Sequence, residues 1–125
     1  MNIILWITQG ILTLMFLMAG SMKMSLPKAK LKEKVGDWVD QTPLNFIKTI
    51  GALEILGAIG LILPQLLDIL PSLAIIAAIG LGLTMIGAIF LHQKRKEFKS
   101  VLTNLFLLAL ILFVIVGRTY LIPIL

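Results

Sequence analysis

Glu54 is the residue of this sequence best placed to do chemistry, because it is an acid in the middle of the apolar run 46–63. A charged side chain at the centre of a bilayer costs about 2.5–3.5 kcal/mol even on the gentlest insertion scale, and such residues usually face a bundle interior or a wet cavity. Two interpretations stay open. Glu54 is either a ligand, proton or ion site, or a protonated acid that joins two helices by hydrogen bonds.

Four other polar residues are predicted to lie near Glu54. Lys23 ends the first apolar run, His92 closes the third, Thr84 has a depth similar to that of Glu54, and Asn104 is one turn inside the fourth run. With Glu54 they predict a ligand-binding pocket that opens to the cytoplasm, in which Lys23 or Thr84 is a near neighbour of the acid. The alternative for Lys23 and His92 is a simple anchor at the lipid interface.

Several kinds of chemistry are excluded by composition. The sequence has no cysteine, so this chain offers no disulfide, thiolate nucleophile, zinc-thiolate site or iron–sulfur ligand. Its single histidine cannot form a metal-binding cluster within one chain, and a bis-histidine haem would need a partner chain. No glycine-rich phosphate loop is present. We therefore predict no catalytic residue and no metal site.

The elements that must position these residues are membrane helices. Apolar residues make up 59% of the 125 residues and charged residues only 14%, too few to coat a soluble domain. A spanning helix needs about 20 mostly apolar residues. Continuous runs of that kind exclude barrel strands, which alternate. The sequence predicts an all-α antiparallel bundle of four transmembrane helices in one domain, 1–125, with spans at 3–22, 46–63, 72–91 and 101–122.

Small residues predict where these helices pack closely. Gly51, Gly57 and Ala58 share the helix face of the central acid, and Gly80 and Gly82 belong to small-residue ladders of the third span. Small side chains let a second helix approach closely. Bundle packing is the first interpretation, and a homodimer that uses the third span is the alternative.

Two features mark the ends of the spans. All five prolines are assigned to positions between or beyond the spans, Pro64 among them, and Thr42 and Ser100 are predicted helix caps. The loop 25–42 carries apolar residues at helical spacing, which predicts a short amphipathic helix between the first two spans. That helix either lies in the lipid interface or caps the bundle in water.

The basic residues predict the orientation. Ten of the eleven lysines and arginines flank the two loops that share one side of the bundle, and only Arg118 lies towards the other side. By the positive-inside rule both loops are cytoplasmic and both termini are outside. The net charge of +5 therefore predicts contact with membrane lipids and not with nucleic acid. Arg118 is expected to be an interfacial anchor, with Asp68 as an alternative partner.

Three segments resemble the DoxX-like family of small four-helix prokaryotic membrane proteins, over nearly the whole chain. They are the F-x-x-A-G-x-x-K pattern of Phe16, Ala19, Gly20 and Lys23, the run GALEILGAIGL over 51–61 with Glu54 at its centre, and the third-helix ending with Met85, Ala88 and His92. Many members carry an arginine early in the first helix, where this chain has Gln9. We therefore do not expect this chain to form a charge pair that depends on that arginine.

The resemblance implies a fold and, by analogy, a class of function. Some relatives are associated with quinone-linked thiosulfate oxidation and others with sulfur or oxidative-stress systems. The resulting hypothesis is a small protein of the bacterial inner membrane that binds a hydrophobic, quinone-like ligand or supports a membrane redox partner, and that is not an enzyme on its own. The alternatives are a dimeric proton-coupled transporter of lipophilic cations and a purely structural subunit. Small multidrug resistance transporters carry their membrane glutamate in the first span, whereas this chain has it in the second.

Overall fold

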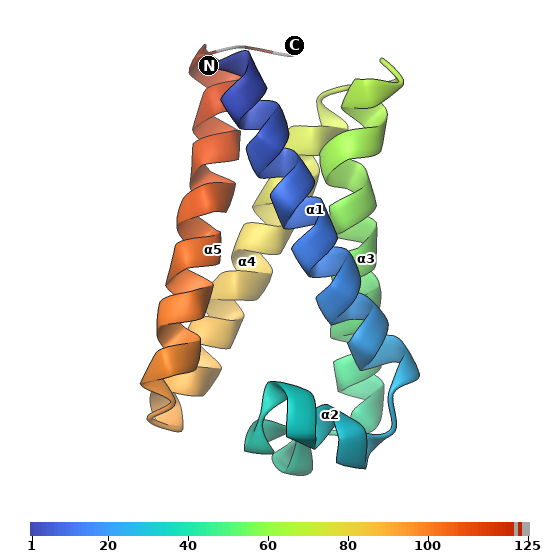
Figure 1. The fold of residues 1–125 in the computed structure, drawn as a ribbon, viewed down its shortest axis with the longest axis vertical. Helices are drawn as coiled ribbons and strands as arrows, with labels where there is room; N and C mark the ends of the chain where they lie inside the picture. Colours follow the sequence, from blue (N-terminus) through green and yellow to red (C-terminus); the bar gives the residue numbers. More distant parts are fainter. Residues whose placement is uncertain (122, 124–125) are drawn as a thin grey trace.

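Four long helices form an up-and-down bundle in the computed structural model, which describes residues 1–121 and 123 (Figure 1). The long helices are α1 (Asn2–Ser25), α3 (Leu44–Leu66), α4 (Leu73–Lys94) and α5 (Phe98–Val116). Two short helices, α2 (Lys28–Val35) and η1 (Asp37–Gln41), lie between α1 and α3, and α5 continues into the π-helical turn η2 (Gly117–Leu121). The described part of the chain contains no strand. All four long helices are apolar and long enough to cross a membrane, which confirms the predicted fold class.

The two ends of the bundle differ. Helix α1 begins and η2 ends at one end of the bundle, here called the terminus end, whereas α2, η1 and the α4–α5 turn occupy the other, here called the loop end (Figure 1). Along the bundle α1 packs on α3, α3 on α4, and α4 on α5. Helices α1 and α5 meet near the termini and move apart towards the loop end (Figure 1). The loop end is therefore the wider end.

The helices extend further than the apolar runs alone predict. Helix α1 continues to Ser25, α3 to Leu66 and α4 to Lys94, because helical hydrogen bonds remain favourable in the polar residues that flank a span. The proposed caps are wrong: α3 begins after Pro43 and α5 after Glu97. The placement of Pro64 outside the helices is also wrong.

Pro64 lies in the last turn of α3, where its missing N–H leaves the carbonyl of Gly60 without its usual partner. The helix ends two residues later, at Leu66.

The predicted amphipathic helix is in fact two short helices. Gly36 separates α2 from η1 with a φ of +119°, a value that side chains with a Cβ rarely adopt. The change of direction at Gly36 lets Leu31, Trp38 and Val39 pack together against Ile47 of α3. This segment therefore covers the loop end of the bundle.

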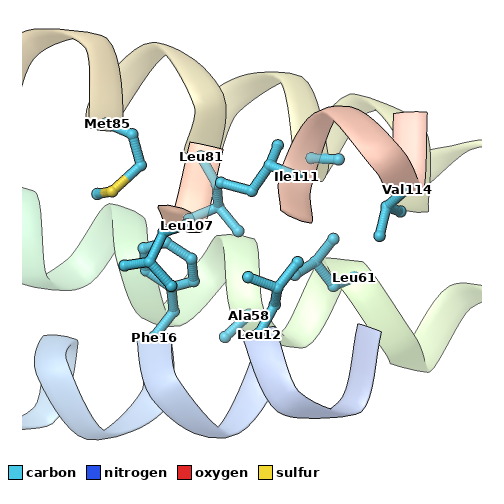
Figure 2. Close-up of a cluster of buried hydrophobic side chains, with 10 residues drawn as sticks. Leu12, Phe16, Ala58, Leu61, Leu81, Met85, Leu107, Ile111 and Val114 are labelled. Atoms are coloured by element: carbon cyan, nitrogen blue, oxygen red, sulfur yellow. The ribbon is translucent and has the colours of Figure 1, made fainter. Parts of the chain in front are cut away.

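The core is a narrow apolar seam to which every long helix contributes. Figure 2 shows side chains of α1, α3, α4 and α5 converging on it. Its labelled members are Leu12, Phe16, Ala58, Leu61, Leu81, Met85, Leu107, Ile111 and Val114. Many large apolar side chains point outward instead, which is the arrangement expected where the surrounding solvent is lipid.

Helices α1 and α3 approach each other closely at two glycines. A Cβ added to Gly20 of α1 would lie 2.6 Å from the carbonyl oxygen of Gly51 of α3, and a Cβ added to Gly51 would lie 2.8 Å from the carbonyl oxygen of Gly20. Backbone meets backbone at this crossing. Among the other predicted packing residues, Gly57 and Gly82 face neighbouring side chains and Ala58 is buried, but Gly80 has open space beside it.

Enlarging Gly20 should therefore open the α1–α3 crossing. We expect Gly20→Leu to destabilise the protein by about 1–3 kcal/mol or more, since overpacking forces backbone shifts. Gly10→Leu is the matched control on the same helix, because a Cβ there would meet nothing within 4 Å. The measurement is thermal unfolding in detergent, and equal melting temperatures for the two variants would contradict the glycine contact.

Candidate functional site

The α1–α3 crossing brings the central acid against a lysine. Lys23 Nζ lies 2.5 Å from Glu54 Oε1, and Glu54 is only 1% exposed. Glu54 thus faces the bundle interior, and Lys23 turns inward to meet it instead of extending to the lipid interface. Because both charges are largely removed from solvent, loss of either partner would leave the other uncompensated.

A large cavity lies beside this ion pair at the loop end. Its volume is about 860 Å³, within the range of about 300–1,000 Å³ typical of ligand sites. Four of the five predicted site residues line it, namely Lys23, Thr84, His92 and Asn104. Glu54 is not a lining residue and reaches the cavity through Lys23. Most of the remaining wall is apolar and includes Ala19, Phe46, Leu53, Met85 and Leu91. We call this space the loop-end cavity.

His92 is held in one orientation by its neighbours. Its Nδ1 lies 2.9 Å from Glu97 Oε1, and its ring packs edge-on against Trp38 with centroids 6.2 Å apart. A carboxylate only accepts, so Nδ1 carries the proton and Nε2 is the acceptor in a neutral ring. His92 is 8% exposed and lines the cavity, so it is a wall residue and not an interfacial anchor.

A second set of contacts closes the loop end. Arg95 Nε donates to the same Glu97 oxygen at 3.2 Å, and Arg95 Nη1 donates to Gln41 of η1 at 2.6 Å. The pKa of Glu97 lies below its ordinary value, first because His92 donates a hydrogen bond to the carboxylate and also because of the charge of Arg95. The α4–α5 turn and η1 are therefore joined across the end of the cavity.

Thr84 and Asn104 differ in how their polar atoms are used. Thr84 Oγ1 donates to the carbonyl of Gly80 in its own helix at 3.0 Å, so this hydroxyl does not donate a hydrogen bond to Glu54. Asn104 Nδ2 is buried and has no hydrogen-bond partner among the described residues. Leaving a buried donor unpaired costs about 1–3 kcal/mol. Asn104 is thus a side chain of the cavity wall with a buried, unpaired donor.

A polar cluster at the terminus end was missed in the reading of the sequence. Arg118 is 1% exposed, donates from Nε to Gln9 Oε1 at 2.7 Å and from Nη1 to Asn2 Oδ1 at 2.6 Å, and lies 5.3 Å from the centroid of the Trp6 ring. Both expectations for Arg118, an interfacial anchor and a pair with Asp68, are wrong. The equal depth of Gln9 and Arg118 in their spans was the available signal.

Gln9 also forms hydrogen bonds to helix α3. Its Nε2 donates to the carbonyl of Leu61 at 2.6 Å and to Gln65 Oε1 at 3.0 Å. Gln9 therefore joins α1, α3 and the end of α5 at the terminus end. Gln9 Oε1 is thus the acceptor for Arg118 of η2, the turn that continues α5.

Comparison with known families agrees with this architecture. A family model described as the DoxX-like family matches residues 7–114. The chain belongs to the DoxX-like family. No curated protein and no solved structure matches it. The family match includes every predicted cavity residue and stops before Arg118. With its four apolar helices, this DoxX-like chain is a small integral membrane protein that crosses the membrane several times.

The Lys23–Glu54 pair predicts strong coupling between two substitutions. Lys23→Met or Glu54→Leu alone should destabilise the protein by about 3–5 kcal/mol, because each leaves one buried charge. The double variant should recover most of that loss, since an apolar pair replaces an ionic one. The measurement is a double-mutant cycle of melting temperatures in detergent, and additive effects would contradict the pair.

The contacts of Glu97 predict a loss of stability in acid. A lowered pKa in the folded state gives stability above the ordinary glutamate value of 4.5, and this stability is lost as the pH falls through the folded-state pKa. Glu97→Gln should therefore lower the melting temperature at neutral pH and reduce its further fall in acid. Glu33→Gln, at an exposed position of α2, is the control and should follow the wild-type profile.

Proposed function

We propose that this DoxX-like protein binds a hydrophobic ligand with an acceptor-bearing head, such as a quinone, in the loop-end cavity. The single observation that carries this is the buried, unpaired Nδ2 of Asn104 in the wall of a largely apolar cavity of about 860 Å³. A ligand carbonyl or other acceptor oxygen would satisfy that donor. A quinone is the proposed head because its carbonyls only accept hydrogen bonds and because some relatives are associated with quinone-linked oxidation.

The other polar residues have distinct roles in this proposal. His92, held by Glu97, contributes a ring of fixed orientation to the cavity wall. Lys23 brings one charge to the wall, and Glu54 balances that charge from behind. The site therefore selects a neutral or acceptor-rich head, because a lipophilic cation would face Lys23 with no free carboxylate. We propose binding, or support of a membrane redox partner, and not catalysis by this chain alone.

The pairing of Glu54 also bears on the two rival functions. A proton-coupled carrier of lipophilic cations would need an acid that meets its substrate in the cavity, whereas Glu54 contacts Lys23 and is not a lining residue. A purely structural subunit would explain the ion pair, but it gives no role to the cavity or to Asn104. Ligand binding accounts for all three features.

We further propose that the loop-end cavity lies on the cytoplasmic side of a prokaryotic cytoplasmic membrane. Ten of the eleven lysines and arginines flank the loops at that end, which supports cytoplasmic loops and external termini. A C-terminal reporter that is active only outside the cytoplasm should be active, and a reporter active only in the cytoplasm should be silent. The opposite result would reverse the orientation.

Ligand binding is tested by melting temperatures with a panel of quinones and lipophilic cations. A ligand that binds only the folded state stabilises it by about 2.7 kcal/mol at a concentration 100-fold above its Kd. We expect quinones to stabilise the wild type and Asn104→Leu to weaken that binding about tenfold, the value of a hydrogen bond near 1.4 kcal/mol. Asn45→Leu, at an exposed position outside the cavity, is the control.

Three outcomes separate the candidate functions. Equal quinone shifts in the wild type and Asn104→Leu would contradict the assigned role of Asn104. Shifts with cations alone would favour the transporter. Shifts with no compound, together with strong coupling of Lys23 and Glu54, would favour the structural subunit.

A further inference from the structure

An apolar groove on the outer surface of α3 and α4 joins the loop-end cavity. Its volume is about 510 Å³, and Leu53 and Thr84 line both spaces. From Leu53 the groove follows α3 to Pro64, and from Thr84 it follows α4 back to Leu73, so it leads towards the terminus end. At 1.5 Å per residue this is about 16 Å, roughly half of a bilayer's hydrocarbon core.

The groove contrasts with the cavity in its chemistry. Thr84 is its single polar lining residue among the described residues, and the hydroxyl of Thr84 is bonded to the Gly80 carbonyl. The cavity, in contrast, offers the unpaired Asn104 donor and is lined by Lys99 and Ser100 as well. A cavity with several polar wall residues that continues into an apolar groove matches a molecule with a head and a tail.

Small residues create the groove. Gly57 and Gly60 of α3 face Leu81 and Ala77 of α4, so the two helices touch along its floor. Gly80 is exposed, and a Cβ added to it would meet nothing within 4 Å. A larger side chain at Gly80 would therefore occupy the groove without disturbing the helix contact beneath it.

The loop end offers a poorer route into the cavity. Trp38 packs against His92, and Gln41 accepts a hydrogen bond from Arg95, so η1 and the α4–α5 turn are joined there. On the α3–α4 side, by contrast, the lining residues Phe46, Leu53 and Gly87 are exposed. This side would face the lipid acyl chains.

We propose that the ligand of the loop-end cavity is a tailed amphiphile of the bilayer that enters between α3 and α4, with its acceptor-bearing head at Asn104 and its apolar tail in the α3–α4 groove. This inference rests on the proposed function and adds the class of ligand: a membrane-resident molecule whose tail is part of recognition. The shared wall at Leu53 and Thr84 makes the head and the tail two parts of one site.

Three glycine-to-leucine variants test the inference with matched chemistry. Gly80 lines the groove, Gly87 lines the cavity and Gly10 lines neither, and a Cβ added to any of the three would meet nothing within 4 Å. Each variant therefore adds the same side chain to a helix with room for it. The probes are a benzoquinone with a decyl chain and the same benzoquinone without the chain, with affinity measured in detergent micelles by ligand-induced thermal shift.

The inference expects a specific pattern. The wild type binds the tailed probe at least tenfold more tightly than the tail-less one. Gly80→Leu removes most of that advantage and leaves the tail-less probe unaffected, Gly87→Leu weakens both probes, and Gly10→Leu changes neither.

Other results would overturn it in distinguishable ways. If the wild type binds neither probe, the proposed function fails and the tail groove with it. If the wild type binds both probes equally and Gly80→Leu changes neither, the cavity stands and the tail groove alone is wrong. If Gly80→Leu converts a dimer to a monomer without changing either affinity, the groove is an interface between two copies and the inference fails.

Discussion

The contact between Gly20 and Gly51 is the constraint on which the rest of this structure depends. With no Cβ on either residue, the backbones of α1 and α3 touch, and an added Cβ on either side would lie within 2.8 Å of the other helix's carbonyl oxygen. One turn further along each helix, the same crossing puts Lys23 within 2.5 Å of Glu54. A wider crossing would separate the ammonium from the carboxylate and leave two buried charges unpaired, at a cost of several kcal/mol.

Hydrogen bonds join the helices at one end of the bundle, and a cavity lies between them at the other end. At the terminus end, Arg118 and Gln9 link α5, α1 and α3 through short hydrogen bonds, and Leu5 packs directly on Gly117. Towards the loop end α1 and α5 diverge, and the segment containing Trp38 covers the opening (Figure 1). In lipid, apolar burial does not drive helices together, so polar bonds and close packing must hold the bundle. The polar contacts between α1 and α3 lie at the terminus end and at their crossing, whereas those of the loop end join the α4–α5 turn to η1. The loop end can therefore enclose a cavity between the long helices.

The buried acid takes on a different meaning once its partner is known. An isolated glutamate in a membrane span suggests a proton or ion site, whereas a glutamate paired with lysine behind a cavity wall suggests a fixed electrostatic support. The proposed recognition then moves to the wall itself, to the unpaired Nδ2 donor of Asn104. In the proposed arrangement Glu54 would serve binding indirectly, by holding Lys23 in place.

What the sequence determined by itself is local in origin. Helix type, the number of spans and the membrane environment follow from the length and apolar content of each run, because every backbone bond in a spanning helix is made within that run. Four of the five predicted pocket residues could also be placed, because depth in the membrane can be counted residue by residue. Lys23, Thr84, His92 and Asn104 line one cavity, whereas Glu54 does not.

The tertiary structure alone decided which residue meets which. These helices are apolar on every side, so the sequence carries little signal for how each one is rotated about its axis. That rotation buried Arg118 against Gln9, turned Thr84 to its own backbone and left Gly80 at an open groove instead of a packed interface. The break at Gly36 was likewise decided by tertiary packing, because only the docking of Trp38 and Val39 on Ile47 requires the chain to change direction there.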